Sequence, residues 1–266
     1  MLGKLMKYEI KATGRILIPL YIALLAFALI NKVFIGTGLH RLNGFGSIPF
    51  ILSIFAYGAT MAAVFIVTFF IIIQRFYKNL LGDEGYLMNT LPVSTISNIT
   101  SKLSIATFWN IISGIVAILS IIIMAFEPVT FANFFAELFN ALSKVSTEIG
   151  GQMLILIVEV IVAILISLIK SVTMIYASIS IGHLFSKHKI LSAFGAFIVL
   201  NIITGAISAV LGITFSYSHY IDAFQNMHSI FPIHMLLIFG ILFNLLFFII
   251  YFIITNYILK NKLNLE

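Results

Sequence analysis

The chain has 266 residues, of which 61% are apolar and only 9% are charged, and its formal net charge is +6 at pH 7. Soluble domains are about half apolar and about a quarter charged, so a water-soluble fold is excluded and lipid must surround most of this chain. The sequence contains no cysteine, which excludes disulfides, thiolate metal sites and cysteine nucleophiles.

Residues 2–15 predict a cationic amphipathic helix that lies on the inner membrane surface. On a helical wheel, four cations fall on one stripe: Lys4, Lys7, Lys11 and Arg15. Glu9 falls among the apolar positions, where it either reaches sideways to water or headgroups or meets a polar group of a neighbouring cytosolic loop. A cleaved signal peptide fits this start less well, because the apolar run that follows continues to Phe34.

Six stretches are long and apolar enough to cross a bilayer, which takes about 20 residues each. They are residues 16–34, 50–73, 103–126, 152–185, 190–215 and 233–259. These runs are continuously apolar, whereas the strands of membrane barrels alternate. The expected fold is therefore all-α: a polytopic membrane protein with six transmembrane helices, forming one membrane domain over residues 1–266. The fourth stretch exceeds one bilayer thickness and must tilt or project beyond it.

The positions of the cations predict the orientation, because cytosolic loops are enriched in lysine and arginine. With the N-terminus in the cytosol, eleven cations fall on the inner side: Lys4, Lys7, Lys11, Arg15, Arg75, Lys78, Lys102, Lys187, Lys189, Lys260 and Lys262. Three fall on the outer side: Lys32, Arg41 and Lys144. Both termini are therefore expected in the cytosol.

The loop over residues 76–94, between the second and third spans, is the most informative segment. Two glycines that allow tight turns flank an acidic pair: Gly82, Asp83, Glu84 and Gly85. Four apolar residues follow that a soluble loop would not normally expose together: Tyr86, Leu87, Met88 and Leu91. Pro92 stops any short helix, and Ser94 can cap the next one. Such a loop either docks on a cytosolic partner or packs on its own helices.

Two further segments lie outside the predicted spans. Residues 127–150 have apolar residues at helical spacing, which predicts an outer interfacial helix starting near Pro128 and Thr130: Phe131, Phe134, Phe135, Leu138, Leu142 and Val145. This helix is either a membrane anchor or a contact for substrate. Residues 216–232 suit a short re-entrant or interfacial element. A metal site at His219, His228 and His234 is disfavoured, because their separations do not place them on one helix face.

Two ionisable residues lie within the fourth span, Glu159 and Lys170. They share a helix face but lie about 16 Å apart along the axis, so they cannot pair directly. Glu159 is a candidate intramembrane polar site, as a lining of an export path or as a proton relay. Small residues four apart predict close helix packing within the bundle or at a dimer seam: Gly58/Ala62, Ala59/Ala63, Gly205/Ala209 and Ser208/Gly212.

Residues 76–88 and 90–93 resemble a signature of bacterial ATP-binding-cassette (ABC) transporter permeases of the type-2 exporter class, also called the type V fold. These segments read FYKNLLGDEGYLM and TLPV. Residues 1–15 are similar to the start of the same family. The resemblance implies an interfacial helix before six spans, a re-entrant segment before the sixth, and a coupling loop that docks on an ATPase. In this chain the coupling residues would be Gly82, Asp83, Glu84, Gly85, Tyr86, Leu87, Leu91 and Pro92.

The resemblance also implies the partners and the location. ATP and Mg²⁺ would bind a separate ABC ATPase subunit, and the permease would act in the bacterial cell membrane as a homodimer or as a heterodimer with a similar permease. This chain has no Gly-x-x-x-x-Gly-Lys-Ser/Thr loop for phosphate, so neither catalytic residues nor a cofactor or metal are expected in it. The long outer helix departs from the compact members of the family, which leaves the substrate open between peptides, lipids and drugs.

Three other functions compete with that of an exporter subunit. A proton-coupled secondary transporter would use Glu159 and would need no ATPase. An immunity or sensor protein could have the same fold and transport nothing. An intramembrane enzyme is disfavoured, because the sequence contains neither Gly-x-Ser-x-Gly nor His-Glu-x-x-His.

Overall fold

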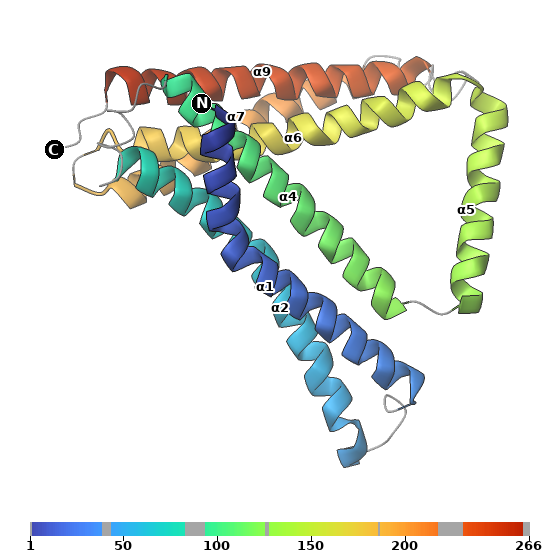
Figure 1. Cartoon of the computed structure of the whole chain (residues 1–266). Coiled ribbons are helices and arrows are strands. Elements are labelled where there is room, and N and C mark those ends of the chain that lie inside the picture. Colours follow the sequence, from blue (N-terminus) through green and yellow to red (C-terminus); the bar gives the residue numbers. More distant parts are fainter. Residues whose placement is uncertain are drawn as a thin grey trace. The chain divides into compact units, whose positions relative to one another are not determined.

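The computed structural model describes residues 2–38, 44–82, 94–125, 128–185, 187–217 and 231–262, and these residues form helices and no strand. The elements in chain order are α1 (Leu2–Gly36), η2 (Gly44–Ser47), α2 (Ile48–Phe76), η3 (Tyr77–Leu81), α4 (Thr95–Ala125), α5 (Pro128–Ile149), α6 (Gln152–Gly182), α7 (Lys189–Tyr217) and α9 (Phe231–Asn261) (Figure 1).

Six helical segments among the described residues are long and apolar enough to cross a membrane: Met6–Gly36, Ile48–Leu81, Thr95–Ala125, Gln152–Gly182, Lys189–Gly212 and Pro232–Asn261. Each of them contains or closely matches one of the six predicted stretches. The all-α fold with six transmembrane helices is therefore confirmed, and the chain is a multi-pass membrane protein. In hydrocarbon a helix satisfies its backbone hydrogen bonds within the segment, which is why uninterrupted apolar runs become helices.

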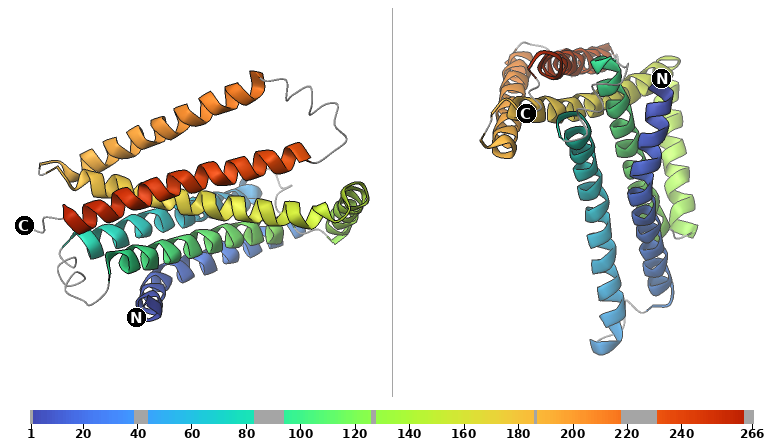
Figure 2. Two further views of the ribbon diagram at one scale, coloured as in Figure 1. Left: turned by 90° about the horizontal axis from the view of Figure 1, so that it is seen from above. Right: turned by 60° about the vertical axis from the view of Figure 1, so that its left-hand side comes forward.

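The separate interfacial helix predicted over residues 2–15 is not supported. These residues are helical, but α1 continues without a break from Leu2 to Gly36. Thr13 and Gly14 are buried, so this part of α1 packs against protein on one side. Figures 1 and 2 show that α1 changes direction in its first half. Pro19 lies inside the helix, and a proline there removes one backbone hydrogen bond and bends the helix.

The chain divides into two compact units, and the first comprises residues 1–75 and 104–142. Its core brings together buried side chains of α1, α2 and α4, including Leu17, Leu24 and Val64. Buried hydrogen bonds join the same helices. The Tyr21 hydroxyl lies 2.8 Å from Ser113 Oγ, and Thr68 Oγ1 lies 2.9 Å from the same oxygen. Hydrophobicity drives helices together only weakly in lipid, so such polar contacts help to fix their packing.

The second unit comprises residues 76–103 and 143–266. In this unit α6 and α9 run side by side and begin at the same end (Figures 1 and 2). Met174 and Ala177 of α6 pack with Phe247 and Tyr251 of α9 in its core. The Tyr251 hydroxyl also forms a hydrogen bond with Thr204 of α7, which connects the third helix of the unit.

A helix is present where the outer interfacial helix was predicted: α5 begins at the predicted Pro128. Proline suits the first position of a helix, because the N–H that it lacks would have no partner there. The described apolar side chains of α5 are exposed, among them Phe134, Leu138 and Phe139. This exposure fits both predicted roles of the helix, a membrane anchor and a contact for substrate.

The glycines of the predicted small-residue pairs make no close helix contact among the described residues. A Cβ atom added to Gly58, Gly205 or Gly212 would meet no described atom within 4 Å. The tight approach lies instead at Gly182, the last residue of α6. A Cβ atom there would lie 2.5 Å from the backbone N and Cα of Ala193 in α7.

Candidate functional site

The described structure includes the two flanks of the predicted coupling loop. Gly82 is the last described residue before it and Ser94 the first after it. The other predicted coupling residues lie outside the described residues: Asp83, Glu84, Gly85, Tyr86, Leu87, Leu91 and Pro92. The helix cap predicted at Ser94 is confirmed, because the Ser97 N–H donates a hydrogen bond to Ser94 Oγ at 3.2 Å.

The flank that precedes the loop is a π-helical turn, η3, which closes on Gly82. The Gly82 N–H donates a hydrogen bond to the carbonyl oxygen of Tyr77 at 2.8 Å. A Cβ atom at position 82 would lie 3.1 Å from the carbonyl oxygen of Lys78, so a side chain would press against the turn. The backbone of Gly82 is extended, with φ −95° and ψ −161°, so the limit on a side chain at this position comes from the close carbonyl and not from the backbone angles.

An aromatic stack fixes this flank to α6. The rings of Phe76 and Tyr176 lie parallel, with centroids 4.0 Å apart and an interplanar angle of 10°. Their side chains are 0% and 1% exposed, and Leu80 and Leu81 of η3 are also buried. Stacked aromatic pairs contribute about 0.5–1.5 kcal/mol beyond the burial of their area. The residues that lead into the loop are therefore held firmly on a membrane-spanning helix of the same unit.

His183, which follows the last residue of α6, adds a second contact between α6 and η3. Its ring centroid lies 6.1 Å from that of Tyr77. Burial lowers the pKa of His183 below its usual 6.5, and the nearby positive charge of Lys189 lowers this pKa further. A hydrogen bond to the backbone of Leu81 acts in the opposite direction on the same pKa. The imidazole is thus mainly neutral near pH 7, and it joins the end of α6 to the end of η3.

The predicted residues of the N-terminal segment lie on the first turns of α1. Lys7, Lys11 and Arg15 are exposed, and Glu9 is half-buried. Lys4 lies in the helix, and its side chain is outside the described residues. The predicted stripe of cations is thus exposed where it is described, on a helix that continues into the first span.

The second candidate site is a carboxylate–imidazole pair between α6 and α9. Glu159 Oε2 lies 2.6 Å from His234 Nδ1, and the two side chains are 14% and 15% exposed. Lys170 lies eleven residues further along α6, half-buried and outside this pair. In a part-buried Glu–His pair each polar side chain supplies the hydrogen-bond partner that the other needs in apolar surroundings. The pair also connects the two helices near the end at which both begin.

Glu159 was predictable from the sequence as a polar site, but its partner was not. His234 was predicted only as a disfavoured metal ligand together with His219 and His228, which lie outside the described residues. Within the described part of the chain, no three His, Cys, Asp or Glu side chains are grouped to hold a metal ion. The two partners are 75 residues apart in sequence. One feature of the sequence could have indicated the pair: Glu159 and His234 each lie in the first turns of an apolar span that starts on the predicted outer side.

No protein-family model, curated protein or solved structure matches this chain. What is established is a multi-pass helical membrane protein with two polar or aromatic sites: the attachment of the loop flank to α6, and the Glu159–His234 pair. Both sites lie in the second unit of the chain.

Proposed function

We propose that this chain is the transmembrane permease subunit of an ATP-driven exporter of the ABC type-2 class. ATP and Mg²⁺ would bind a separate ATPase subunit, and this chain would move a hydrophobic or peptide-like substrate. The proposal rests on the pattern of residues 76–93 between the second and third of six apolar spans. It places the protein in a bacterial cell membrane with both termini in the cytosol.

The observation that carries the proposal is the attachment of the loop flank to α6. A loop that transmits force must be fixed to the helices that it moves. Phe76 is stacked on Tyr176, and the whole segment 76–103 belongs to the same compact unit as α6, α7 and α9. Movement of the loop by an ATPase would therefore be passed to these three helices, as a rigid-body step of the kind that drives alternating access.

Within the loop, the proposed division of roles follows the chemistry of the side chains. Tyr86 and Leu87 are the apolar anchors that insert into a groove of the ATPase, since buried aromatic and apolar residues dominate interface energies. Asp83 and Glu84 lie at the rim, where they face basic groups and set the orientation of docking. Gly82, Gly85 and Pro92 shape the loop.

Copurification tests the proposal. We expect an ABC ATPase encoded beside this chain to copurify with it from detergent extract, and its ATP hydrolysis to change when this chain is bound. In parallel, a single cysteine at Thr37 should react with an impermeant thiol reagent on intact cells, and one at Lys187 should not. If no ATPase binds the parent chain, the immunity or sensor function becomes the better proposal. If only the Lys187 cysteine reacts, the orientation and the coupling loop are both wrong.

One observation favours a second candidate function, a proton-coupled secondary transporter. The Glu159–His234 pair has the chemistry of a proton-binding site within the membrane. Such a transporter would work without an ATPase and would depend on a proton gradient. We favour the exporter, because the pair also has a simpler structural role in joining α6 to α9.

A double-mutant cycle tests the structural role of the pair. Glu159→Leu and His234→Leu should each destabilise the protein, because each leaves one part-buried polar side chain without its hydrogen-bond partner. The loss of unfolding free energy in the double variant should be smaller than the sum of the two single losses. We expect a difference of about 1 kcal/mol, as for other hydrogen bonds between membrane helices. Reversible unfolding in detergent measures this coupling free energy.

The conservative variant Glu159→Gln keeps a hydrogen-bonding partner for His234 but cannot ionise. We expect it to change the rate or selectivity of export modestly and to leave ATP-driven export in place. Complete loss of export by a folded, ATPase-bound Glu159→Gln protein would instead establish proton transfer as part of the mechanism.

A further inference from the structure

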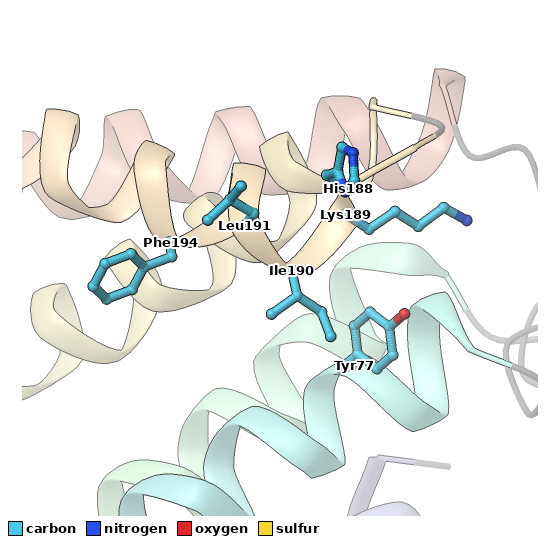
Figure 3. Close-up of a pocket in the computed structure, with 6 residues that line it drawn as sticks. All are labelled: Tyr77, His188, Lys189, Ile190, Leu191 and Phe194. Carbon is cyan, nitrogen blue, oxygen red and sulfur yellow. The ribbon is translucent and has the colours of Figure 1, made fainter.

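A groove with a volume of about 630 Å³ lies where η3 meets the start of α7 (Figure 3). One residue of η3 and five residues at the start of α7 line it: Tyr77, His188, Lys189, Ile190, Leu191 and Phe194. All six belong to the second unit of the chain. Tyr77 lies at the start of the predicted loop over residues 76–94, whereas the five residues of α7 and its start lie outside both that loop and the Glu159–His234 pair.

The groove is polar at one end and apolar at the other. In Figure 3 the Tyr77 hydroxyl and the Lys189 ammonium lie on one side, and Phe194 lies on the opposite side. Ile190 points toward Tyr77 and forms the middle. Along α7, Phe194 is five residues further into the span than Lys189, about 7.5 Å at the rise of an α-helix. This polarity matches a molecule with a polar head and an apolar tail.

The apolar side chains of the groove are largely exposed. Ile190 is 80% exposed, Leu191 69% and Phe194 62%. These residues belong to a membrane-spanning helix, so their exposed side chains contact lipid acyl chains.

The charge at the polar end favours an anion. Lys187 is exposed and Lys189 half-exposed, and the sequence contains no Asp or Glu between Glu159 and Asp222. The first N–H groups of α7 point out of the helix at the same end, where they and the helix dipole attract negative charge. Basic pockets between membrane helices are known to hold anionic lipid headgroups.

We propose that this groove binds one anionic phospholipid. Its phosphate lies against Lys189 and the Tyr77 hydroxyl, with Lys187 close by, and an acyl chain follows Ile190, Leu191 and Phe194. The bound lipid connects η3 to α7 beside the flank of the coupling loop. This site does not depend on the exporter function, so the two proposals can fail separately.

Native mass spectrometry of the purified full chain in a non-ionic detergent tests the site. The probes are dioleoyl-phosphatidylglycerol, dioleoyl-phosphatidylcholine and the water-soluble sn-glycerol 3-phosphate. We expect phosphatidylglycerol to bind at least roughly tenfold more tightly than the other two. The variant Lys187→Gln with Lys189→Gln should lose most of this preference, since each lysine near the surface contributes about fivefold to anionic lipid binding.

Matched variants control for general charge and general hydrophobicity. Lys260→Gln with Lys262→Gln removes two exposed lysines at the same spacing from the end of α9, and it should bind phosphatidylglycerol like the parent. Ile190→Ser with Phe194→Ser should weaken phosphatidylglycerol binding. Leu242→Ser with Leu246→Ser, an exposed pair at the same spacing on α9, should leave it unchanged.

Four results would overturn the proposal. Equal binding of phosphatidylcholine would remove the role of charge. Equal binding of glycerol phosphate would reduce the site to a simple anion site. Unchanged phosphatidylglycerol binding by the Lys187/Lys189 variant would place the lipid elsewhere. A lipid-independent dimer that the Ile190/Phe194 variant abolishes would assign the groove to a second copy of the chain.

Discussion

Replacement of Gly182 by alanine is expected to destabilise the protein strongly. The added methyl group would lie 2.5 Å from the N, Cα and Cβ atoms of Ala193, and real Cβ atoms do not approach other atoms so closely. Because two of the three atoms are backbone, no side-chain rotation relieves the clash, and α6 and α7 must move apart. Overpacking of a well-packed core costs about 1–3 kcal/mol, and a clash with backbone belongs at the upper end of that range.

Gly195→Ala in α7 is the matched control for this prediction. A Cβ atom at Gly195 meets no atom within 4 Å, and alanine is favoured over glycine inside a helix by about 1 kcal/mol. We therefore expect Gly195→Ala to leave the melting temperature in detergent unchanged or higher, and Gly182→Ala to lower it. Adding Ala193→Gly to Gly182→Ala should restore stability only in part, because the backbone atoms of residue 193 remain. Equal melting temperatures for the two alanine variants would show that α6 and α7 do not approach each other at this point.

Replacement of Tyr86 and Leu87 together by alanine is expected to abolish copurification of the ATPase without reducing the amount of inserted protein. Truncating a buried aromatic anchor commonly costs about 2 kcal/mol or more, which is roughly thirtyfold in affinity. Insertion depends on the apolar spans, and this loop lies between two of them. The measurement is a pull-down from detergent extract, together with the ATP hydrolysis of the bound ATPase.

Two comparisons make this prediction specific to the loop. Asp83→Asn with Glu84→Gln should weaken the association less, because charges at a rim are partly screened by solvent and salt. The association of the parent, in turn, should weaken only modestly at high salt. Phe134→Ala with Phe139→Ala removes two exposed aromatics of α5 and should leave ATPase binding intact. If the Tyr86/Leu87 variant binds the ATPase as well as the parent does, these residues are not the anchors.

The attachment of the loop and the docking of the loop are separable experimentally. Phe76 and Tyr176 form the attachment, whereas Tyr86 and Leu87 are proposed to dock. A variant that loses docking should bind no ATPase. A variant that loosens the attachment, such as Phe76→Leu, should bind the ATPase but couple its hydrolysis to transport less well.

The sequence by itself determined the helical elements and several of their boundaries. Apolar runs predicted all six spans, and Pro128 and Ser94 predicted the starts of α5 and α4. These features can be predicted because they are local. A backbone in lipid must satisfy its hydrogen bonds within the helix, and a cap or an N-terminal proline acts within one turn. The same local reasoning separated residues 2–15 from the first span, whereas α1 continues through them and packs at Thr13 and Gly14.

Only the tertiary structure decided which side chains meet. The pair Glu159–His234 joins residues far apart in sequence, and Phe76 is stacked on Tyr176 about a hundred positions later. The close approach at Gly182 was likewise not predicted by the spacing of small residues, which indicated Gly58 and Gly205 instead. The physical reason is that helices surrounded by lipid carry apolar side chains on nearly every face, whether the face contacts lipid or another helix. Hydrophobic periodicity therefore carries little information about neighbours, and shape and a few polar contacts select them.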